Sequence, residues 1–137
     1  MEKFFKVYIY TPFGQYLTTN ADYLSTTTAM GVIGVLPNHA PLISTLEISK
    51  LIIRSEGKEF RYAISGGVIN IKKDHSVTLL VDAIERSDEI DVSRALAAQK
   101  RAEERLQKQQ ELTEIDVNRA KASLLRALNR LDVSDNN

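Results

Sequence analysis

The chain has 137 residues, a formal net charge of zero and no cysteine. Nucleic-acid binding draws most of its affinity from basic residues that neutralise phosphates, so the balanced charge argues against it. The lack of cysteine excludes disulfides and thiolate chemistry. The first residues do not have the layout of a signal peptide, and no apolar run approaches the roughly 20 residues of a membrane-spanning helix. We therefore expect membrane contact only through a partner.

The first part of the chain is rich in β-forming and turn-forming residues. All three prolines, all six glycines and every aromatic residue precede Asp82. Apolar residues at period two, separated by short polar turns, are typical of strands. The predicted strands cover residues 4–10, 21–28, 47–54, 58–64, 67–72 and 76–81. Short strands with hairpin-sized turns indicate an antiparallel β-sandwich or barrel rather than a doubly wound nucleotide-binding fold.

Residues 31–46, GVIGVLPNHAPLISTL, are predicted to form an exposed, rigid corner between strands. Glycine permits positive φ, and proline cannot donate to a strand ladder. His39 lies between the two prolines of this corner, and two roles are open for it: a locally bonded turn histidine or an interface residue. Residues 65–67, Ser-Gly-Gly, lack the Gly-Lys-Ser/Thr ending of a phosphate loop and are interpreted as a tight connection between strands.

Residues 82–95 join the β unit to a helical unit of different composition. Residues 90–95 (IDVSRA) and 115–120 (IDVNRA) are nearly the same, and each puts Asp where it can cap a helix. Helices are predicted over residues 91–110 and 116–131. Their short connection favours an antiparallel hairpin with an alanine-rich seam. Such a hairpin would suit a movable arm.

Several motifs occur together in one order. They are Gly-x-x-Gly-x-Leu-Pro-x-His-Ala-Pro-Leu at 31–42, Ser-Gly-Gly at 65–67, Val-Thr-Leu at 77–79 with Asp82, and Ile-Asp-x-x-Arg-Ala at 90–95. Over essentially its whole length the chain resembles the epsilon subunit of bacterial F-type ATP synthase. The resemblance implies an N-terminal antiparallel β-sandwich over residues 1–84 and a C-terminal two-helix hairpin over residues 85–137.

The resemblance also implies a function. The β-sandwich would dock on the gamma subunit and the ring of c subunits in the central stalk. The hairpin would change between a folded form and an extended form that reaches the alpha and beta subunits and restrains ATP hydrolysis. The chain would be a non-catalytic regulatory subunit, peripheral on the cytoplasmic side of the cell membrane, and it would require no cofactor.

ATP is the regulatory ligand that the resemblance allows, because some members of the family bind it at the folded hairpin. The residues that match are Glu85, Asp91, Arg94, Arg101, Arg126 and Arg130. Arg94 and Arg101 share a helix face, as do Arg126 and Arg130, so a folded hairpin could direct four guanidinium groups at a triphosphate. The alternative is a solvated face with local ion pairs. The acidic residues around Asp88 do not match the pattern of a calcium-binding EF-hand loop. Acidic residues at the start of a helix ordinarily interact with the helix dipole.

The subunit interface implied by the resemblance is the corner, with Gly31, Val32, Ile33, His39 and Pro41. Val32 stands where relatives commonly carry an acidic or polar residue, so we expect an apolar contact there. Residues 109–114 form a longer connection than in ATP-binding relatives, which could shift Arg126 and Arg130 relative to Arg94.

Two other classes of function stay open from the sequence. A free-standing ATP-sensing module would bind ATP without assembling with a stalk protein. A small enzyme on a β scaffold would need a clustered nucleophile and base, and neither histidine has a convincing set around it.

Overall fold

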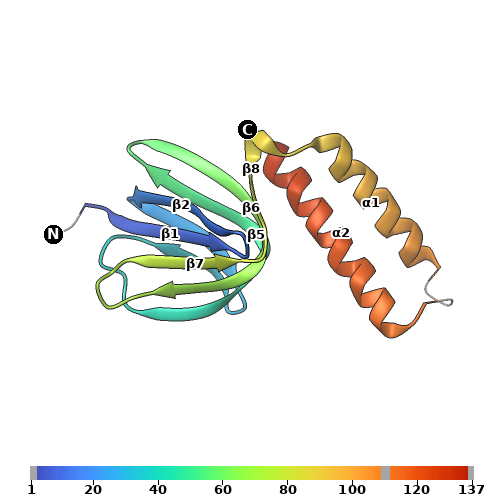
Figure 1. The fold of residues 1–137 in the computed structure, drawn as a ribbon, viewed down its shortest axis with the longest axis horizontal. Helices are drawn as coiled ribbons and strands as arrows, with labels where there is room; N and C mark the ends of the chain where they lie inside the picture. The colour runs from blue at the N-terminus through green and yellow to red at the C-terminus, as the bar shows by residue number, and fades with distance from the viewer. Residues whose placement is uncertain (1–2, 109–111, 136–137) are drawn as a thin grey trace. The chain divides into compact units, whose positions relative to one another are not determined.

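The computed structural model describes residues 3–108 and 112–135, and the chain divides into two compact units, Met1–Arg86 and Ser87–Asn137 (Figure 1). The first unit consists of strands and the second of helices. No helix among the described residues is long and apolar enough to cross a membrane.

The described part of the first unit is one hydrogen-bonded sheet folded into a sandwich. The strand order is β2-β1-β7-β6-β5-β3-β4, with β8 paired to β6. Figure 1 shows the two longest strands, β5 and β6, curving at one end, so that a single sheet supplies both layers. The strands are β1 (Phe5–Thr11), β2 (Gly14–Ala21), β3 (Tyr23–Thr28), β4 (Gly31–Val35), β5 (Leu42–Ser55), β6 (Lys58–Ile71), β7 (Val77–Val81) and β8 (Ile84–Arg86).

The core of the sandwich follows from alternation along its strands. In β1, Phe5, Val7 and Ile9 are buried while their neighbours are not. Side chains at i and i+2 lie on one face of a strand, so an alternating strand buries one face. Each fully buried aliphatic side chain contributes about 1.5–3 kcal/mol through removal of apolar surface from water. The predicted sandwich is confirmed, with one parallel pair, β1 with β7, among otherwise antiparallel strands.

The predicted corner at residues 31–46 is shorter in the structure, because both ends of this range belong to strands. Gly31–Val35 forms β4, an edge strand that pairs with β3, and β5 already begins at Leu42. Glycine keeps its backbone N–H and C=O, so Gly31 and Gly34 can still pair with Thr28 and Ser25 of β3. The connection without strand structure is therefore residues 36–41, where Asn38 has a φ of 68°.

The prediction of a strand break at residues 65–67 was wrong. β6 runs without interruption from Lys58 to Ile71, and Gly66 and Gly67 have φ values of 101° and 139°. These values allow the strand to bend while it continues to pair with β5. A Cβ at Gly67 would lie 2.0 Å from the backbone oxygen of Leu80, so only glycine fits beside β7.

The second unit contains two helices, α1 (Val92–Gln107) and α2 (Glu114–Asp135), after a single 3-10 turn, η1 (Ser87–Glu89). The helices pack against each other as the predicted antiparallel hairpin (Figure 1). α2 begins two residues before the predicted start because Thr113 caps it, its hydroxyl accepting the Asp116 N–H at 3.2 Å. The last predicted residues of the first helix, 109 and 110, lie outside the described residues.

The fold predicts that Gly67→Ala destabilises the first unit by at least about 3 kcal/mol, because the added methyl group meets backbone and the φ is unfavourable. Chemical denaturation followed by circular dichroism would measure the loss. Gly57→Ala is the matched control, since Gly57 also has a positive φ, 77°, but faces open space. Equal losses in the two variants would contradict the close approach of β6 and β7.

Candidate functional site

The alanine seam of the hairpin determines where the candidate ligand residues lie. Ala95 and Ala102 on α1, and Ala120 and Ala127 on α2, are at most 2% exposed. In each helix the two alanines are seven residues apart, which returns to the same face after two turns. Alanine has the smallest side chain that can fill such a contact, so the helices approach closely through these four residues.

An arginine precedes each of the four buried alanines. These arginines are Arg94, Arg101, Arg119 and Arg126. One residue is about 100° around a helix, so each arginine lies at the same side of the seam on its own helix. In an antiparallel pair, positions with the same offset from the seam lie on the same side of the pair. All four arginines therefore belong to one surface, which we call the basic flank.

The antiparallel order sets which arginines lie opposite each other. α1 ends at Gln107 and α2 begins at Glu114, so counting back from the connection brings Arg94 level with Arg126 and Arg101 level with Arg119. The same count brings η1 level with the end of α2, where the two elements are in contact. The basic flank thus has two tiers, each with one arginine from each helix.

Further cations extend the basic flank. Arg105 and Lys108 follow Arg101 at four and seven positions, and a hollow of about 220 Å³ lies beside these three residues and Glu104. Arg130 follows Arg126 by one turn and is half-buried. The Arg126 guanidinium donates to the Ser123 hydroxyl at 3.2 Å.

The two acidic residues predicted to bind ATP lie at different places in the fold. Asp91 is the N-cap of α1, and its Oδ1 accepts the backbone N–H of Arg94 at 3.1 Å. This bond fixes one carboxylate oxygen and leaves the other for a ligand. Glu85 belongs to β8, where it is opposite Ala63 of β6, so it is part of the first unit. The five other predicted ATP residues all lie in the second unit.

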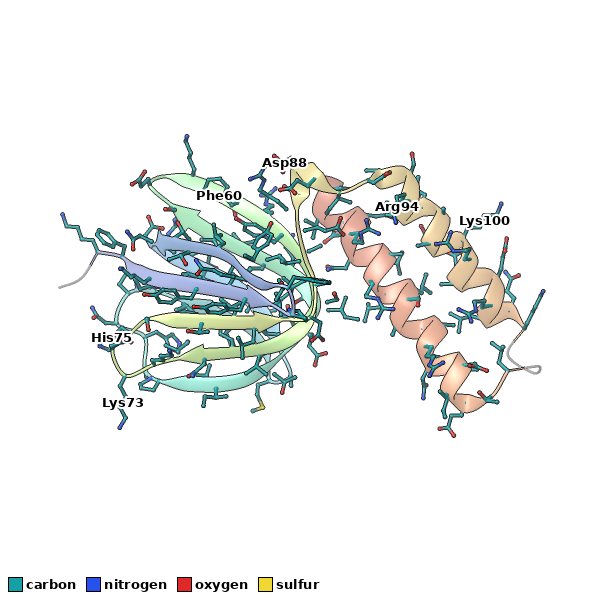
Figure 2. All side chains as sticks on the ribbon, viewed as in Figure 1. Phe60, Lys73, His75, Asp88, Arg94 and Lys100 are labelled. Atoms are coloured by element: carbon teal, nitrogen blue, oxygen red, sulfur yellow. The ribbon has the colours of Figure 1, made fainter. Side chains whose placement is uncertain are left out.

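The sequence prediction missed Arg119 and the tier that it forms with Arg101. The signal was present as the dipeptide Arg-Ala, which occurs at spacing seven in each helix. Figure 2 labels Arg94 and also Lys100, which lies on the side of α1 away from the seam. Lys100 is therefore a cation of similar exposure that does not belong to the basic flank.

The predicted subunit interface gathers around β4. Val32 is 74% exposed on this edge strand, whereas Ile33 packs against the core. The preceding turn is fixed by Thr28, whose hydroxyl donates to the Gly31 carbonyl at 2.9 Å and accepts the Met30 N–H at 3.1 Å. Met30 in this turn is 89% exposed, so this turn and the start of β4 carry two exposed apolar side chains.

His39 and Pro41 lie in the connection from β4 to β5. The His39 ring contacts the Ala40 carbonyl through Nδ1 at 2.7 Å, and the His39 carbonyl accepts the Nδ1–H of His75 at 3.2 Å. A carbonyl can only accept, so both rings carry their proton on Nδ1 when neutral. These bonds are those of a locally bonded turn histidine, and His39 is half-buried, while its role at a subunit interface stays a prediction.

Comparison with known proteins identifies both units. The family described as "ATP synthase, Delta/Epsilon chain, beta-sandwich domain" matches residues 4–87, and its "long alpha-helix domain" matches residues 88–135. The ATP synthase epsilon chain of Bacillus licheniformis is 42% identical over 132 residues, covering 96% of this chain and 98% of the relative. That of Pelotomaculum thermopropionicum is 46% identical over 100 residues, covering 73% of this chain and 74% of the relative.

Two solved structures have the same fold at low sequence identity. A chain of the Euglena gracilis mitochondrial ATP synthase, solved with OSCP, F1 and the c-ring, is 20% identical with a TM-score of 0.83, covering 94% of this chain and 80% of that one. A chain from the central stalk and c-ring of the Tetrahymena thermophila mitochondrial ATP synthase is 14% identical with a TM-score of 0.67, covering 97% of each.

The N-cap geometry predicts that Asp91→Ala weakens the start of α1 by about 1 kcal/mol, because the Arg94 N–H loses its acceptor. Amide hydrogen exchange over residues 92–96 would detect the loss as faster exchange. Glu104→Ala, an exposed change within α1, is the control. Unchanged exchange in Asp91→Ala would contradict the capping role.

Proposed function

The chain belongs to the epsilon chains of ATP synthase, and we propose that its hairpin is a regulatory arm that binds ATP when folded and restrains ATP hydrolysis when extended. An epsilon chain is a non-catalytic stalk subunit of this synthase. The observation that carries the proposal is the basic flank, in which two helices each contribute an arginine to each of two tiers.

The basic flank has the chemistry of a polyphosphate site. A guanidinium group offers a planar fork of donors that matches phosphate oxygens, and hydrogen bonds between charged groups are stronger than neutral ones. Four arginines on one surface also repel one another, and a bound polyanion relieves this repulsion. The free oxygen of Asp91 is an acceptor at the end of the flank where Arg94 and Arg126 lie.

This arrangement gives ATP a reason to favour one form of the arm. The two tiers exist only while α1 and α2 lie side by side, because each tier takes one arginine from each helix. An extended arm would separate those pairs and bind ATP more weakly. A ligand shifts a conformational equilibrium only by its difference in affinity for the two states. ATP would therefore hold the arm folded, and low ATP would release it.

The β-sandwich would dock in the central stalk through β4 and the preceding turn. Met30 in the turn and Val32 in β4 are exposed apolar side chains, and a patch of exposed apolar side chains favours a protein contact. We assign this contact to the gamma subunit and the c ring, and the extended arm to the alpha and beta subunits. Membrane association would then be peripheral, on the cytoplasmic side, and only through the complex.

Calorimetric titration tests the ATP site. We expect saturable ATP binding to the full chain, weaker binding of ADP, and at least about a tenfold loss in Arg94→Ala, Arg119→Ala and Arg126→Ala, because a charged hydrogen bond contributes about 1.5–3 kcal/mol. Asp91→Asn keeps the cap and removes the charge, which separates a ligand role from a capping role.

Lys100→Ala is the matched control for that experiment, since it removes an exposed cation from the other side of α1. Equal loss in Lys100→Ala and Arg126→Ala would mean that ATP is attracted by general charge and not bound at the basic flank. Absence of saturable binding at millimolar ATP would overturn the ATP site and leave membership of the family intact.

Val32→Asp tests the docking surface. We expect binding to purified gamma subunit to weaken by about tenfold or more, because an unpaired carboxylate would be buried in an apolar contact. Phe13→Asp is the control, since Phe13 is 99% exposed in a different turn of the same sandwich. If the wild-type chain bound ATP but not gamma, a free-standing ATP sensor would replace the stalk assignment.

A further inference from the structure

A second concave site lies in the β unit, on the outer face of β1. The cleft has a volume of about 400 Å³, within the range of small-molecule sites. It follows from the same alternation that builds the core. Phe5 and Val7 are buried, so Lys6 and Tyr8 face outward along β1, and Phe4, directly before the strand, is exposed.

The neighbouring strand adds a polar group to this face. Lys6 is directly opposite Asn20 of β2, and opposite residues in a sheet project to the same side. Lys3 lies at the mouth of the cleft, just before β1. Within the residues that the structure describes, no hydrogen bond or ion pair occupies the side chains of Lys3, Lys6 or Tyr8.

The far wall of the cleft is the turn from β6 to β7, labelled at Lys73 and His75 in Figure 2. Asp74 accepts two bonds from Ser76 through Oδ1, from the backbone N–H at 3.0 Å and from the hydroxyl at 2.6 Å. His75 has a φ of 70° and donates its backbone N–H to the Lys72 carbonyl at 2.9 Å. Because its ring also donates to the His39 carbonyl, the wall is held at three points.

The charges of the cleft favour an anion. The bonds from Ser76 lower the pKa of Asp74, so its carboxylate is ionised at neutral pH. Those bonds direct one oxygen of the carboxylate at its own turn. Lys3 and Lys6 supply two ammonium groups against this one carboxylate, and the Asn20 amide and Tyr8 hydroxyl supply neutral donors.

The rings of the cleft favour a flat apolar group beside the anion. Phe4 lines the cleft and is 57% exposed, so its ring is accessible to a ligand there. Its place two residues before Lys6 on the same face brings an aromatic surface next to an ammonium group. A flat membrane surface would not need a cleft, whereas a small molecule with a ring and an anionic end would fill one.

We propose that this cleft binds a small organic phosphate that carries an aromatic ring. The phosphate lies between Lys3 and Lys6 and accepts from the Asn20 amide, and the ring packs on Phe4 and Tyr8. The site is independent of the basic flank, because all of its residues belong to the β unit. A test of this site can therefore fail without affecting the proposal that ATP binds at the hairpin, and the reverse is also true.

Nuclear magnetic resonance titration of the full chain tests the site with three probes: phenyl phosphate, inorganic phosphate and phenol. We expect saturable shifts of the Lys6, Asn20 and His75 amides with phenyl phosphate, and affinities at least about tenfold weaker for the two fragments, because each lacks one half of the contacts. Lys6→Ala should weaken the binding of phenyl phosphate by about tenfold, and replacement of Lys58, an exposed lysine at the start of β6, by alanine should not.

Several results would overturn the proposal. Equal affinities for phenyl phosphate and inorganic phosphate would show that the ring makes no favourable contact in the cleft. Loss of the shifts in Arg126→Ala would place the binding at the hairpin. Absence of saturable shifts, together with Lys6-dependent sedimentation on phosphatidylglycerol vesicles, would assign this face to an anionic membrane instead. A retained spectrum in Lys6→Ala shows that any loss of binding is not loss of folding.

Discussion

The contact between alanines is the constraint on which the helical unit depends. Alanine lets two helices approach closely, but each alanine buries little apolar surface; among the described residues of this unit, the larger buried apolar side chains are Ile90 and Val133. Short helices are marginal in water without tertiary packing. The arginines beside the seam lower the stability of the helix pair further, because like charges on one surface repel. The proposed function uses this weakness, because a weakly held pair separates at low cost and a bound anion or a partner subunit would then decide its state.

The β unit has the opposite energetics. Its core includes many fully buried isoleucine, leucine and valine side chains, and its strands form one continuous hydrogen-bonded ladder. β6 crosses from one layer to the other without interruption only because Gly66 and Gly67 permit the bend. The proposed function needs this difference in stability, because the arm would have to change state while the docking surface of the β unit stays intact.

The sequence predicted those features that are local or periodic. The alternation in β1 and the helical period of α1 and α2 can each be recognised from a few neighbouring residues. Distant contacts are therefore not needed to predict these elements. Features that depend on a distant partner were missed. β4 is a strand because β3 lies beside it, and Gly66–Gly67 continues β6 because β7 leaves no room for a side chain. Nothing within those segments distinguishes an edge strand or a bend from a turn.

The candidate site shows a similar division. Motif matching selected Arg94 and Arg126 as ATP ligands, which stays a prediction, and it grouped the arginines by helix, whereas the folded hairpin groups them by tier across the seam. Arg119 was not selected because its place opposite Arg101 depends on the other helix. The zero net charge of the chain also concealed the basic flank. Glu103 follows Ala102 and balances part of the sum from the other side of the seam, whereas Glu104 lines the same hollow as Arg101, Arg105 and Lys108 and offsets part of their charge. The cations of the basic flank still outnumber its carboxylates, so a chain that is neutral overall has one locally basic surface.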